Sequence, residues 1–145
     1  VLVGDGPSKR TLMDAAAARG LRNVRFLDPV PAEEVAALLA AADAIAVTLK
    51  MDIPGAVPSK IYESMASEKP LVLVAEGEAA EIVRAADAGF VVSPGDIEGL
   101  TRAVRGLARD PRRVAQLGAN GRRAVESLYD RRRIVDRFAN ELESA

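Results

Sequence analysis

The sequence has neither cysteine nor histidine among its 145 residues. A disulfide framework, a cysteine-based metal site and a catalytic triad are therefore excluded within this chain. The lack of cysteine is compatible with the cytoplasm, where thiols stay reduced, and we expect the protein to be located there. No apolar run reaches the ~20 residues that cross a bilayer, and no segment resembles a signal peptide.

Aromatic residues are also scarce, at 3% of the chain, although hydrophobic residues make up 49%. A core must therefore consist of alanine, valine, leucine and isoleucine, which suits helices packed on a parallel sheet. The 20 basic and 21 acidic residues leave a net charge of −1, so no overall field attracts nucleic acid or a membrane. Neither an RNA-binding aromatic platform nor a recognition-helix motif is present, and we expect no nucleic-acid partner.

Short β-rich runs alternate with longer helical stretches, the pattern of βαβ units in a parallel sheet. We expect strands in the runs 1–3, 23–27, 44–49, 70–75 and 90–92. Helices follow from Asp96 to the C-terminus, with Asp96 and Asp110 as N-caps. The sequence thus predicts one α/β domain over residues 1–145, with a doubly wound, Rossmann-like parallel sheet of about five strands and additional C-terminal helices.

Apolar patterns also predict which segments are buried. The run 44–49 is apolar enough to be covered on both faces, as a central strand would be. The last helix begins near Asp130 and carries apolar residues at helical spacing, so we expect this stripe to face the core. Its members are Ile134, Val135, Phe138 and Leu142.

The loop Gly4-Asp5-Gly6-Pro7 follows the first strand, and ligands of open parallel sheets bind beyond such strand ends. Its glycines allow close backbone approach to an anion at the start of the next helix. Asp28 follows at about the spacing of a dinucleotide-binding fingerprint, but Lys9 stands where that motif needs its third glycine. A nicotinamide-cofactor site is therefore disfavoured, and a turn that needs glycine for its geometry explains the loop equally well.

The segment 57–74 is more informative. Pro58 opens a helix, and the helix dipole, the Ser59 hydroxyl and the Lys60 ammonium could together hold a diphosphate. Glu63 lies one turn further on the same side, where its carboxylate could accept two hydrogen bonds from a ribose diol. An ordinary amphipathic helix with a solvated lysine and glutamate would show the same residues.

The chain resembles the C-terminal domain of retaining glycosyltransferases of the GT-B fold, of a type similar to glycosyltransferase family 4. The resemblance rests on VGDGP, NVRFLDPVPAEEVAALLAAADAIAVTL, PSKIYESMASEKPLVLV, GEAAEIVRAADAGFVVSPGD and LGANGRRAVESLYDRRRIVDRF, in that order. It covers nearly the whole chain, and the Ser-Lys-x-x-Glu-x-Met-Ala stretch is its most specific part. The PSK before the helix is similar to the L-fucosamine transferase subgroup, which acts in surface-polysaccharide assembly.

The resemblance implies that the chain binds a nucleotide-sugar donor, expected to be a uridine-diphosphate sugar, for retaining transfer. Glu63 matches the family's ribose-binding glutamate, and Ser59 and Lys60 match positions near the phosphates. Gly4 and Gly6 match the glycine loop beside the nucleotide, and Leu27 and Asp28 fall where relatives contact the base through backbone groups. The scheme implies no cofactor and no metal, and no residue of this chain matches a catalytic base.

Two departures from the family pattern bear on activity. Gly55 stands eight positions before Glu63, where the first glutamate of the family's pair is expected. The family's phosphate-binding arginine and lysine, and the domain that binds the glycan or lipid-linked acceptor, would precede Val1. We therefore expect the donor half of a longer enzyme, inactive alone. The alternatives are a degenerate domain kept as an interaction module, or a nucleotide-sugar epimerase, which the absence of histidine disfavours.

Arginines gather toward the C-terminus, at positions 112, 113, 122, 123, 131, 132, 133 and 137. A solvated helix face balanced by nearby acidic residues is one interpretation. Contact with the missing domain is a second. The third is peripheral contact with the inner face of a membrane, where anionic lipids attract cationic side chains.

Overall fold

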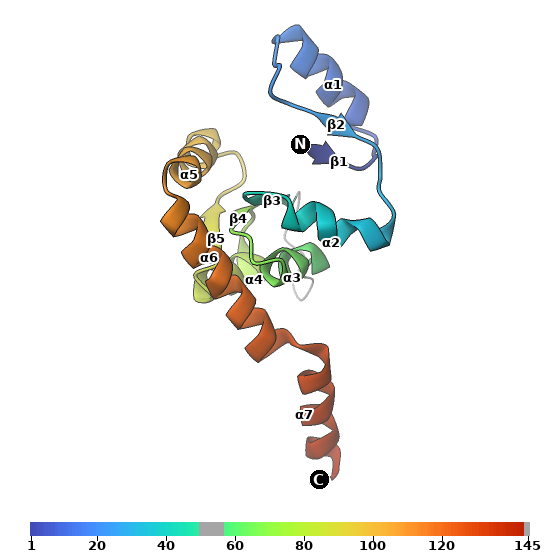
Figure 1. The fold of residues 1–145 in the computed structure, drawn as a ribbon, viewed down its shortest axis with the longest axis vertical. Coiled ribbons are helices and arrows are strands. Elements are labelled where there is room, and N and C mark those ends of the chain that lie inside the picture. The colour runs from blue at the N-terminus through green and yellow to red at the C-terminus, as the bar shows by residue number, and fades with distance from the viewer. Residues whose placement is uncertain (50–56, 144–145) are drawn as a thin grey trace. The chain divides into compact units, whose positions relative to one another are not determined.

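The structure, a computed structural model, describes residues 1–49 and 57–143 (Figure 1). The chain forms two compact units, Val1–Ala36 and Ala37–Ala145.

The first unit is built on a short parallel strand pair. Strand β1 (Leu2–Val3) pairs with β2 (Phe26–Leu27), with Leu2 opposite Phe26. Helix α1 (Lys9–Ala18) connects them and ends at Gly20, whose φ of +62° is the left-handed conformation that glycine adopts readily. No residue of this unit is fully buried. Helix α2 (Ala32–Ala40) begins directly after Pro31 and leads into the second unit.

The second unit contains a three-stranded parallel sheet in the order β3-β4-β5. The strands are β3 (Ile45–Thr48), β4 (Leu71–Val74) and β5 (Gly89–Val92). Strand β4 is central, and its Leu73 lies opposite Val47 on one side and Val91 on the other. Gly89 is required for this pairing, because a Cβ there would lie 2.1 Å from the carbonyl oxygen of Leu71.

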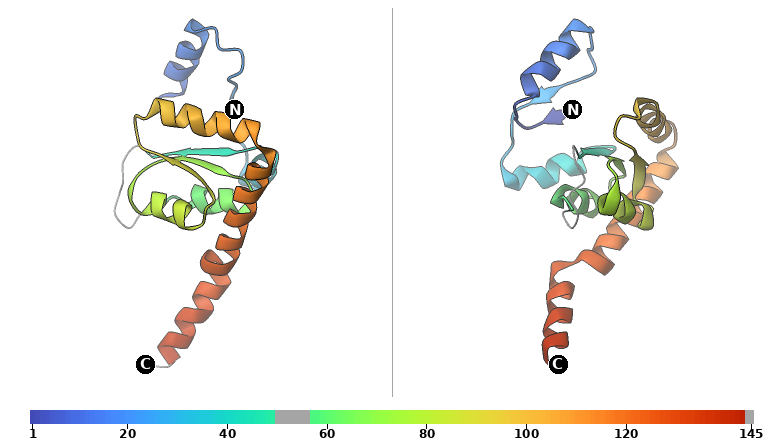
Figure 2. Two further views of the ribbon diagram at one scale, coloured as in Figure 1. Left: turned by 90° about the vertical axis from the view of Figure 1, so that its left-hand side faces the viewer. Right: turned by 180° about the vertical axis from the view of Figure 1, so that it is seen from behind.

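Helices cover both faces of this sheet (Figure 2). Helices α3 (Ser59–Ala66) and α4 (Gly77–Ala85) lie on one face and α5 (Ile97–Arg109) on the other. The two core clusters contain alternate residues of β4, because successive side chains of a strand point to opposite faces. One cluster contains Ile61, Met65, Leu71, Leu73 and Val83. The other contains Val72, Val92, Ala103, Leu107 and Leu117.

The chain ends with α6 (Pro111–Ala124), the π-helical turn η1 (Val125–Tyr129) and α7 (Arg131–Glu143). The predicted N-caps of the C-terminal helices are confirmed. The Asp96 carboxylate accepts a hydrogen bond from the Gly99 amide at 2.7 Å, and Asp110 accepts one from the Arg113 amide at 2.9 Å. Arg113 also forms an ion pair with Asp87 at 2.8 Å, which fastens α6 to the turn before β5.

The predicted α/β class and the five parallel strands are confirmed, but three packing predictions need correction. The strands form two sheets, because no ladder joins β1 to β3 among the described residues. Strand β3 is an edge strand rather than a central one, although its Val47 is buried. The α7 stripe does not face the core, since nothing described packs over it: Ile134, Val135, Phe138 and Leu142 are 44%, 56%, 61% and 63% exposed.

None of the helices within residues 1–49 and 57–143 is both long and apolar enough to cross a membrane.

Candidate functional site

The glycine loop of the first unit is tied to the end of β2. The Gly4 amide donates a hydrogen bond to the carbonyl oxygen of Leu27 at 3.2 Å. Gly4 has a φ of +130°, a conformation that residues other than glycine rarely adopt. A Cβ at Gly4 or Gly6 would meet no atom within 4 Å, so the space beside the loop is open. The loop can therefore present its backbone to a ligand.

Lys9, on the first turn of α1, links that helix to the same strand end. Its Nζ donates to the carbonyl oxygen of Leu27 at 3.2 Å and pairs with the Asp28 carboxylate at 2.8 Å. The hydrogen bond from Lys9, followed by its charge, holds the pKa of Asp28 below its usual value. Lys9 thus fixes two of the predicted nucleotide-contacting residues relative to the helix that follows the glycine loop.

From the sequence, Lys9 is recognised only as a departure from a glycine motif. The sequence nevertheless contains a signal for its ion pair with Asp28. In adjacent parallel strands the carboxyl ends meet at one edge, so a cation on the first turn after β1 can reach an acidic residue just after β2.

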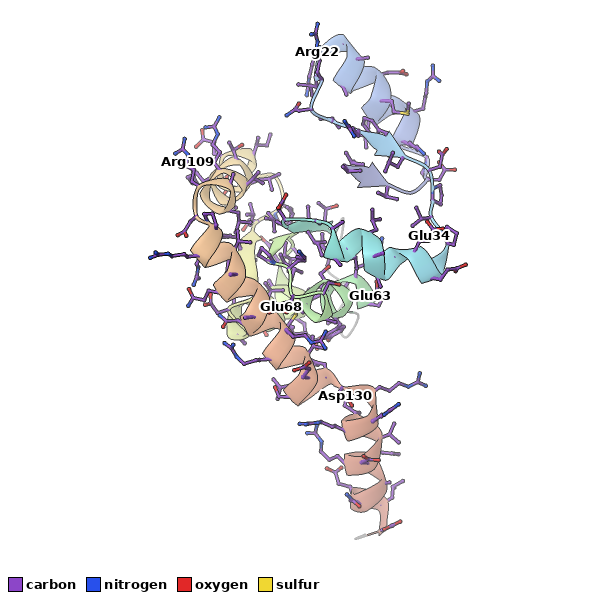
Figure 3. The ribbon with its side chains drawn as sticks, viewed as in Figure 1. Arg22, Glu34, Glu63, Glu68, Arg109 and Asp130 are labelled. Carbon is purple, nitrogen blue, oxygen red and sulfur yellow. The ribbon has the colours of Figure 1, made fainter. Side chains whose placement is uncertain are left out.

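Helix α3 carries the other predicted donor residues, of which Glu63 is labelled in Figure 3. At about 100° per residue, Ser59, Lys60 and Glu63 fall within an arc of about 100°, and all three are exposed. The buried residues of this helix are Ile61, Ser64 and Met65. The core thus fixes this helix with its three polar residues toward solvent.

The first turn of α3 is suited to bind an anion. No side chain caps its N-terminus, which follows the extended Pro58, and its first turn contains no acidic residue. The backbone amides there and the positive end of the helix dipole favour a phosphate group. In the described part of the chain, neither Lys60 nor Glu63 is engaged in an ion pair.

The structure brings the predicted residues together in two groups. Gly4, Gly6, Leu27 and Asp28 meet in the first unit, and Ser59, Lys60 and Glu63 share a helix face in the second. Gly55 lies outside the described residues. No group of three or more acidic residues that could hold a metal ion occurs within residues 1–49 and 57–143.

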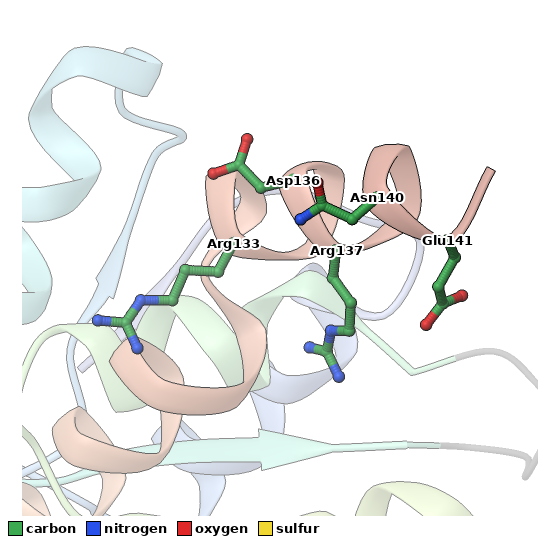
Figure 4. A pocket seen from close by; sticks show the side chains of 5 residues that line it. All are labelled: Arg133, Asp136, Arg137, Asn140 and Glu141. Carbon is green, nitrogen blue, oxygen red and sulfur yellow. The ribbon is translucent and has the colours of Figure 1, made fainter. Parts of the chain in front are cut away.

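Two surface hollows lie in the second unit, and neither contains a predicted donor residue. One, of about 290 Å³, lies between α4, α6 and η1. The other is lined by the polar face of α7 alone, with Arg133, Asp136, Arg137, Asn140 and Glu141 (Figure 4). Since one helix supplies all its walls, it encloses no ligand-sized cavity.

Residues 1–124 match the family model of group 1 glycosyl transferases. The chain belongs to this family. The matched range contains both groups of predicted donor residues, and the resemblance to glycosyltransferases is confirmed at the level of the family.

Curated relatives of known activity add detail. A GDP-mannose-dependent alpha-(1-6)-phosphatidylinositol monomannoside mannosyltransferase of Mycolicibacterium smegmatis is 36% identical over 128 residues, covering 83% of this chain and 33% of the relative. A GDP-mannose-dependent monoacylated alpha-(1-6)-phosphatidylinositol monomannoside mannosyltransferase of Corynebacterium glutamicum is 31% identical over 150 residues, covering 99% of this chain and 38% of the relative.

Solved structures agree with the fold. Anabaena Alr3699/HepE in complex with UDP-glucose matches 99% of this chain and 40% of its own, with a TM-score of 0.83 and 28% identity. Sucrose-phosphate synthase from Thermosynechococcus elongatus has a TM-score of 0.79 at 23% identity, which shows the fold alone. The chain spans about a third to two fifths of the length of these relatives.

Proposed function

We propose that this chain is the donor-binding part of a longer retaining glycosyltransferase, and that it binds a nucleoside-diphosphate sugar. The observation that carries the proposal is the exposed face of α3. A lysine, a serine and a glutamate without ion-pair partners among the described residues lie there at the uncapped N-terminus of a helix. Membership of the group 1 glycosyl transferases supports a sugar-nucleotide ligand for this face.

In this proposal the α3 turn binds the charged and ribose parts of the donor. Lys60 and the first backbone amides hold the diphosphate, with the Ser59 hydroxyl beside them. Glu63 accepts hydrogen bonds from the ribose hydroxyls. When the sugar leaves, negative charge grows on the diphosphate, and the same cationic and N–H groups stabilise it. The scheme requires no metal and no cofactor, and this chain supplies no general base to it.

The first unit contacts the base. The Leu27 carbonyl oxygen already accepts hydrogen bonds from the Gly4 amide and Lys9. A carbonyl oxygen has two lone pairs, so we assign the hydrogen bonds to the base to the backbone of Asp28. The Leu27 side chain, 43% exposed, supplies an apolar contact. Gly4 and Gly6 leave room for the nucleotide.

Uracil is the proposed base, and a structural neighbour solved with UDP-glucose supports it. Guanine is a second candidate, because two relatives that are 36% and 31% identical are named as GDP-mannose-dependent. The transferred sugar would be a hexose or an N-acetylhexosamine, and the L-fucosamine subgroup remains a prediction.

We further propose that the acceptor is a glycan or lipid-linked molecule bound by another part of the full-length protein, in surface-polysaccharide or glycoconjugate synthesis. The mannosyltransferases among its relatives are named for phosphatidylinositol-linked substrates. Such acceptors would place the enzyme in the cytoplasm at the inner face of the membrane, where the arginines of α7 favour peripheral contact with anionic lipid.

A non-catalytic interaction module and a nucleotide-sugar epimerase are the alternative functions.

Calorimetric titration of the full-length protein with UDP and GDP tests the proposal. We expect Glu63→Gln to weaken binding of the preferred nucleotide by about 1–3 kcal/mol, the size of a hydrogen bond to a charged group. Glu98→Gln, on the exposed first turn of α5, is the matched control and should leave affinity unchanged. Unchanged affinity in Glu63→Gln would exclude the ribose role. Sugar transfer is measured with the same preparation, and its presence favours the enzyme over the interaction module.

A further inference from the structure

Helix α3 is only eight residues long, so the direction of its donor-binding face depends on what holds it from outside. The C-terminal helices supply much of that support. The Arg122 guanidinium donates a hydrogen bond to the carbonyl oxygen of Ala66 in the last turn of α3, at 2.5 Å. Its Nε forms an ion pair with Glu126, also at 2.5 Å, so the arginine is held from both sides.

Close backbone packing reinforces this link. A Cβ at Gly121 would lie 3.4 Å from the Met65 Cα and 3.2 Å from the Ala88 Cβ. The packing at Gly118 is closer, because a Cβ there would lie 2.2 Å from the carbonyl oxygen of Glu68. Helix α6 therefore rests directly against α3 and the turn that follows it.

A pair of tyrosines adds a contact nearer to the donor face. The rings of Tyr62 on α3 and Tyr129 on η1 have centroids 4.8 Å apart and planes inclined at 48°, an attractive tilted geometry for aromatic rings. Both tyrosines are half-buried. Burial is the main cause that raises the pKa of Tyr62, with smaller contributions from Tyr129 and Glu78.

The position of Tyr62 on the helix gives this contact its significance. At about 100° per residue, Tyr62 lies about 60° from Ser59 around the helix axis, at the border between the buried and exposed faces. The apolar core constrains the opposite side of α3 through Ile61 and Met65. A ring held at the border opposes rotation of the helix about its own axis, which would turn Glu63 away from its ligand.

Tyr129 is the last residue of the π-helical turn η1, and this turn determines the direction of its side chain. Residues 125–129 adopt i→i+5 hydrogen bonding directly after the fourteen α-helical residues of α6. The wider turn changes the direction in which its last residue points, compared with an unbroken α-helix. Turns of this kind are rare and occur frequently at functional sites.

We infer that Tyr129 is a positioning residue for donor binding: through its ring contact with Tyr62, it holds the α3 turn in the rotation that presents Ser59, Lys60 and Glu63 to the donor. The inference rests on the proposed function, because it assumes that this turn binds the nucleotide. The role assigned to Tyr129 is indirect and rests on its contact with Tyr62. Its effect on affinity therefore passes through the α3 residues.

A double-mutant cycle in the full-length protein tests this inference. The variants are Tyr129→Ala, Tyr129→Phe, Glu63→Gln and the combination of Tyr129→Ala with Glu63→Gln. Leu128→Ala is the control, since Leu128 lies on the same π-helical turn but is 57% exposed. The dissociation constants of UDP and GDP are measured by calorimetry, and thermal unfolding is followed alongside.

We expect Tyr129→Ala to raise the dissociation constant roughly three- to tenfold, a typical coupling for residues in one contact network. Tyr129→Phe, which keeps the ring, and Leu128→Ala should stay within about twofold of the unaltered protein. In the Glu63→Gln background the effect of Tyr129→Ala should be smaller, because Glu63 is one of the three residues that Tyr129 positions and its contribution is already lost.

Two results would overturn the inference while leaving the proposed function intact. One is unchanged affinity in Tyr129→Ala while Glu63→Gln weakens binding. The other is an equal loss from Tyr129→Ala in both backgrounds, which would indicate a general loss of structure. If Glu63→Gln itself changes nothing, the ribose role is wrong, and the inference that rests on it is wrong with it.

Discussion

The two units differ in how they bury their apolar residues. In Val1–Ala36 no residue is fully buried, and Leu2, Leu12 and Leu21 are 45%, 47% and 45% exposed. In the second unit Leu71, Leu73 and Leu117 are all 0% exposed. Both units nevertheless have parallel strands joined by a helix. Local sequence thus specifies strands and helices in both units, although β1 and β2 have only two residues each, whereas burial depends on which surfaces meet.

The largest difference should appear in leucine truncations. Leu73→Ala on the central strand leaves a cavity and should cost about 2–5 kcal/mol of unfolding free energy. Leu12→Ala on α1, already 47% exposed, should cost roughly 0.5 kcal/mol or less. Urea unfolding followed by far-ultraviolet circular dichroism reports on both units, because α1 lies in the first and α3 to α7 lie in the second. Equal losses in the two variants would contradict the contrast between the units.

Two glycines test close packing inside the second unit. Gly118→Ala places a methyl group 2.2 Å from the Glu68 carbonyl oxygen and should destabilise by about 1–3 kcal/mol. Gly106→Ala on α5 meets no atom within 4 Å and should stabilise by roughly 0.4–1 kcal/mol through helix propensity. Thermal unfolding of both variants provides the check. A stabilising Gly118→Ala would show that α6 does not rest against the turn after α3.

Helix N-caps allow the two units to be compared in their polar contacts as well. Asp96 caps α5 through the Gly99 amide, so Asp96→Ala should cost about 1 kcal/mol. Ser8 precedes α1 but makes no side-chain capping bond, so Ser8→Ala should change stability by only a few tenths of a kcal/mol or so. Chemical denaturation distinguishes the two, and a larger loss from Ser8→Ala would contradict the assigned caps.

The smallest effect concerns pH in the first unit. Lys9 holds the pKa of Asp28 below the ordinary value of 3.8. A lowered folded-state pKa stabilises the fold above the unfolded value, and this contribution is lost as pH falls through the folded pKa. Carboxyl NMR titration should find Asp28 titrating below 3.8, and Lys9→Met should restore the ordinary pKa. An Asp28 titration unaffected by Lys9→Met would show that the ion pair does not form in solution.

Much of the fold could be predicted from the sequence, because its signals are local. Alternating β-rich and helical runs located the five strands, and Asp96 and Asp110 marked helix starts through capping chemistry that is visible in one turn of chain. Which strands pair with one another is harder to predict from the sequence, because the partners lie far apart along the chain. The apolar run 44–49 predicted a central strand, but β3 is an edge strand, because within residues 1–49 and 57–143 only β4 pairs with it.

The α7 stripe shows the same limit. Its spacing correctly predicts an amphipathic helix, but spacing does not identify what covers the apolar face, and Phe138 is 61% exposed. On the candidate site, helical periodicity correctly grouped Ser59, Lys60 and Glu63. The roles of Lys9 and Tyr129 depend on contacts 19 and 67 residues away along the chain, to Asp28 and Tyr62. The first contact can be predicted only once β1 is paired with β2, and the second depends on how η1 packs on α3.

The central claim is that both groups of residues serve a nucleotide-sugar donor, and hydrogen–deuterium exchange of the full-length protein tests it most directly. Exchange is compared with and without UDP, with GDP and ADP in parallel. The account predicts protection confined to peptides covering residues 4–6, 27–28 and 59–63, with one nucleotide preferred. A folded protein that shows no protection at these peptides with any nucleotide would contradict it.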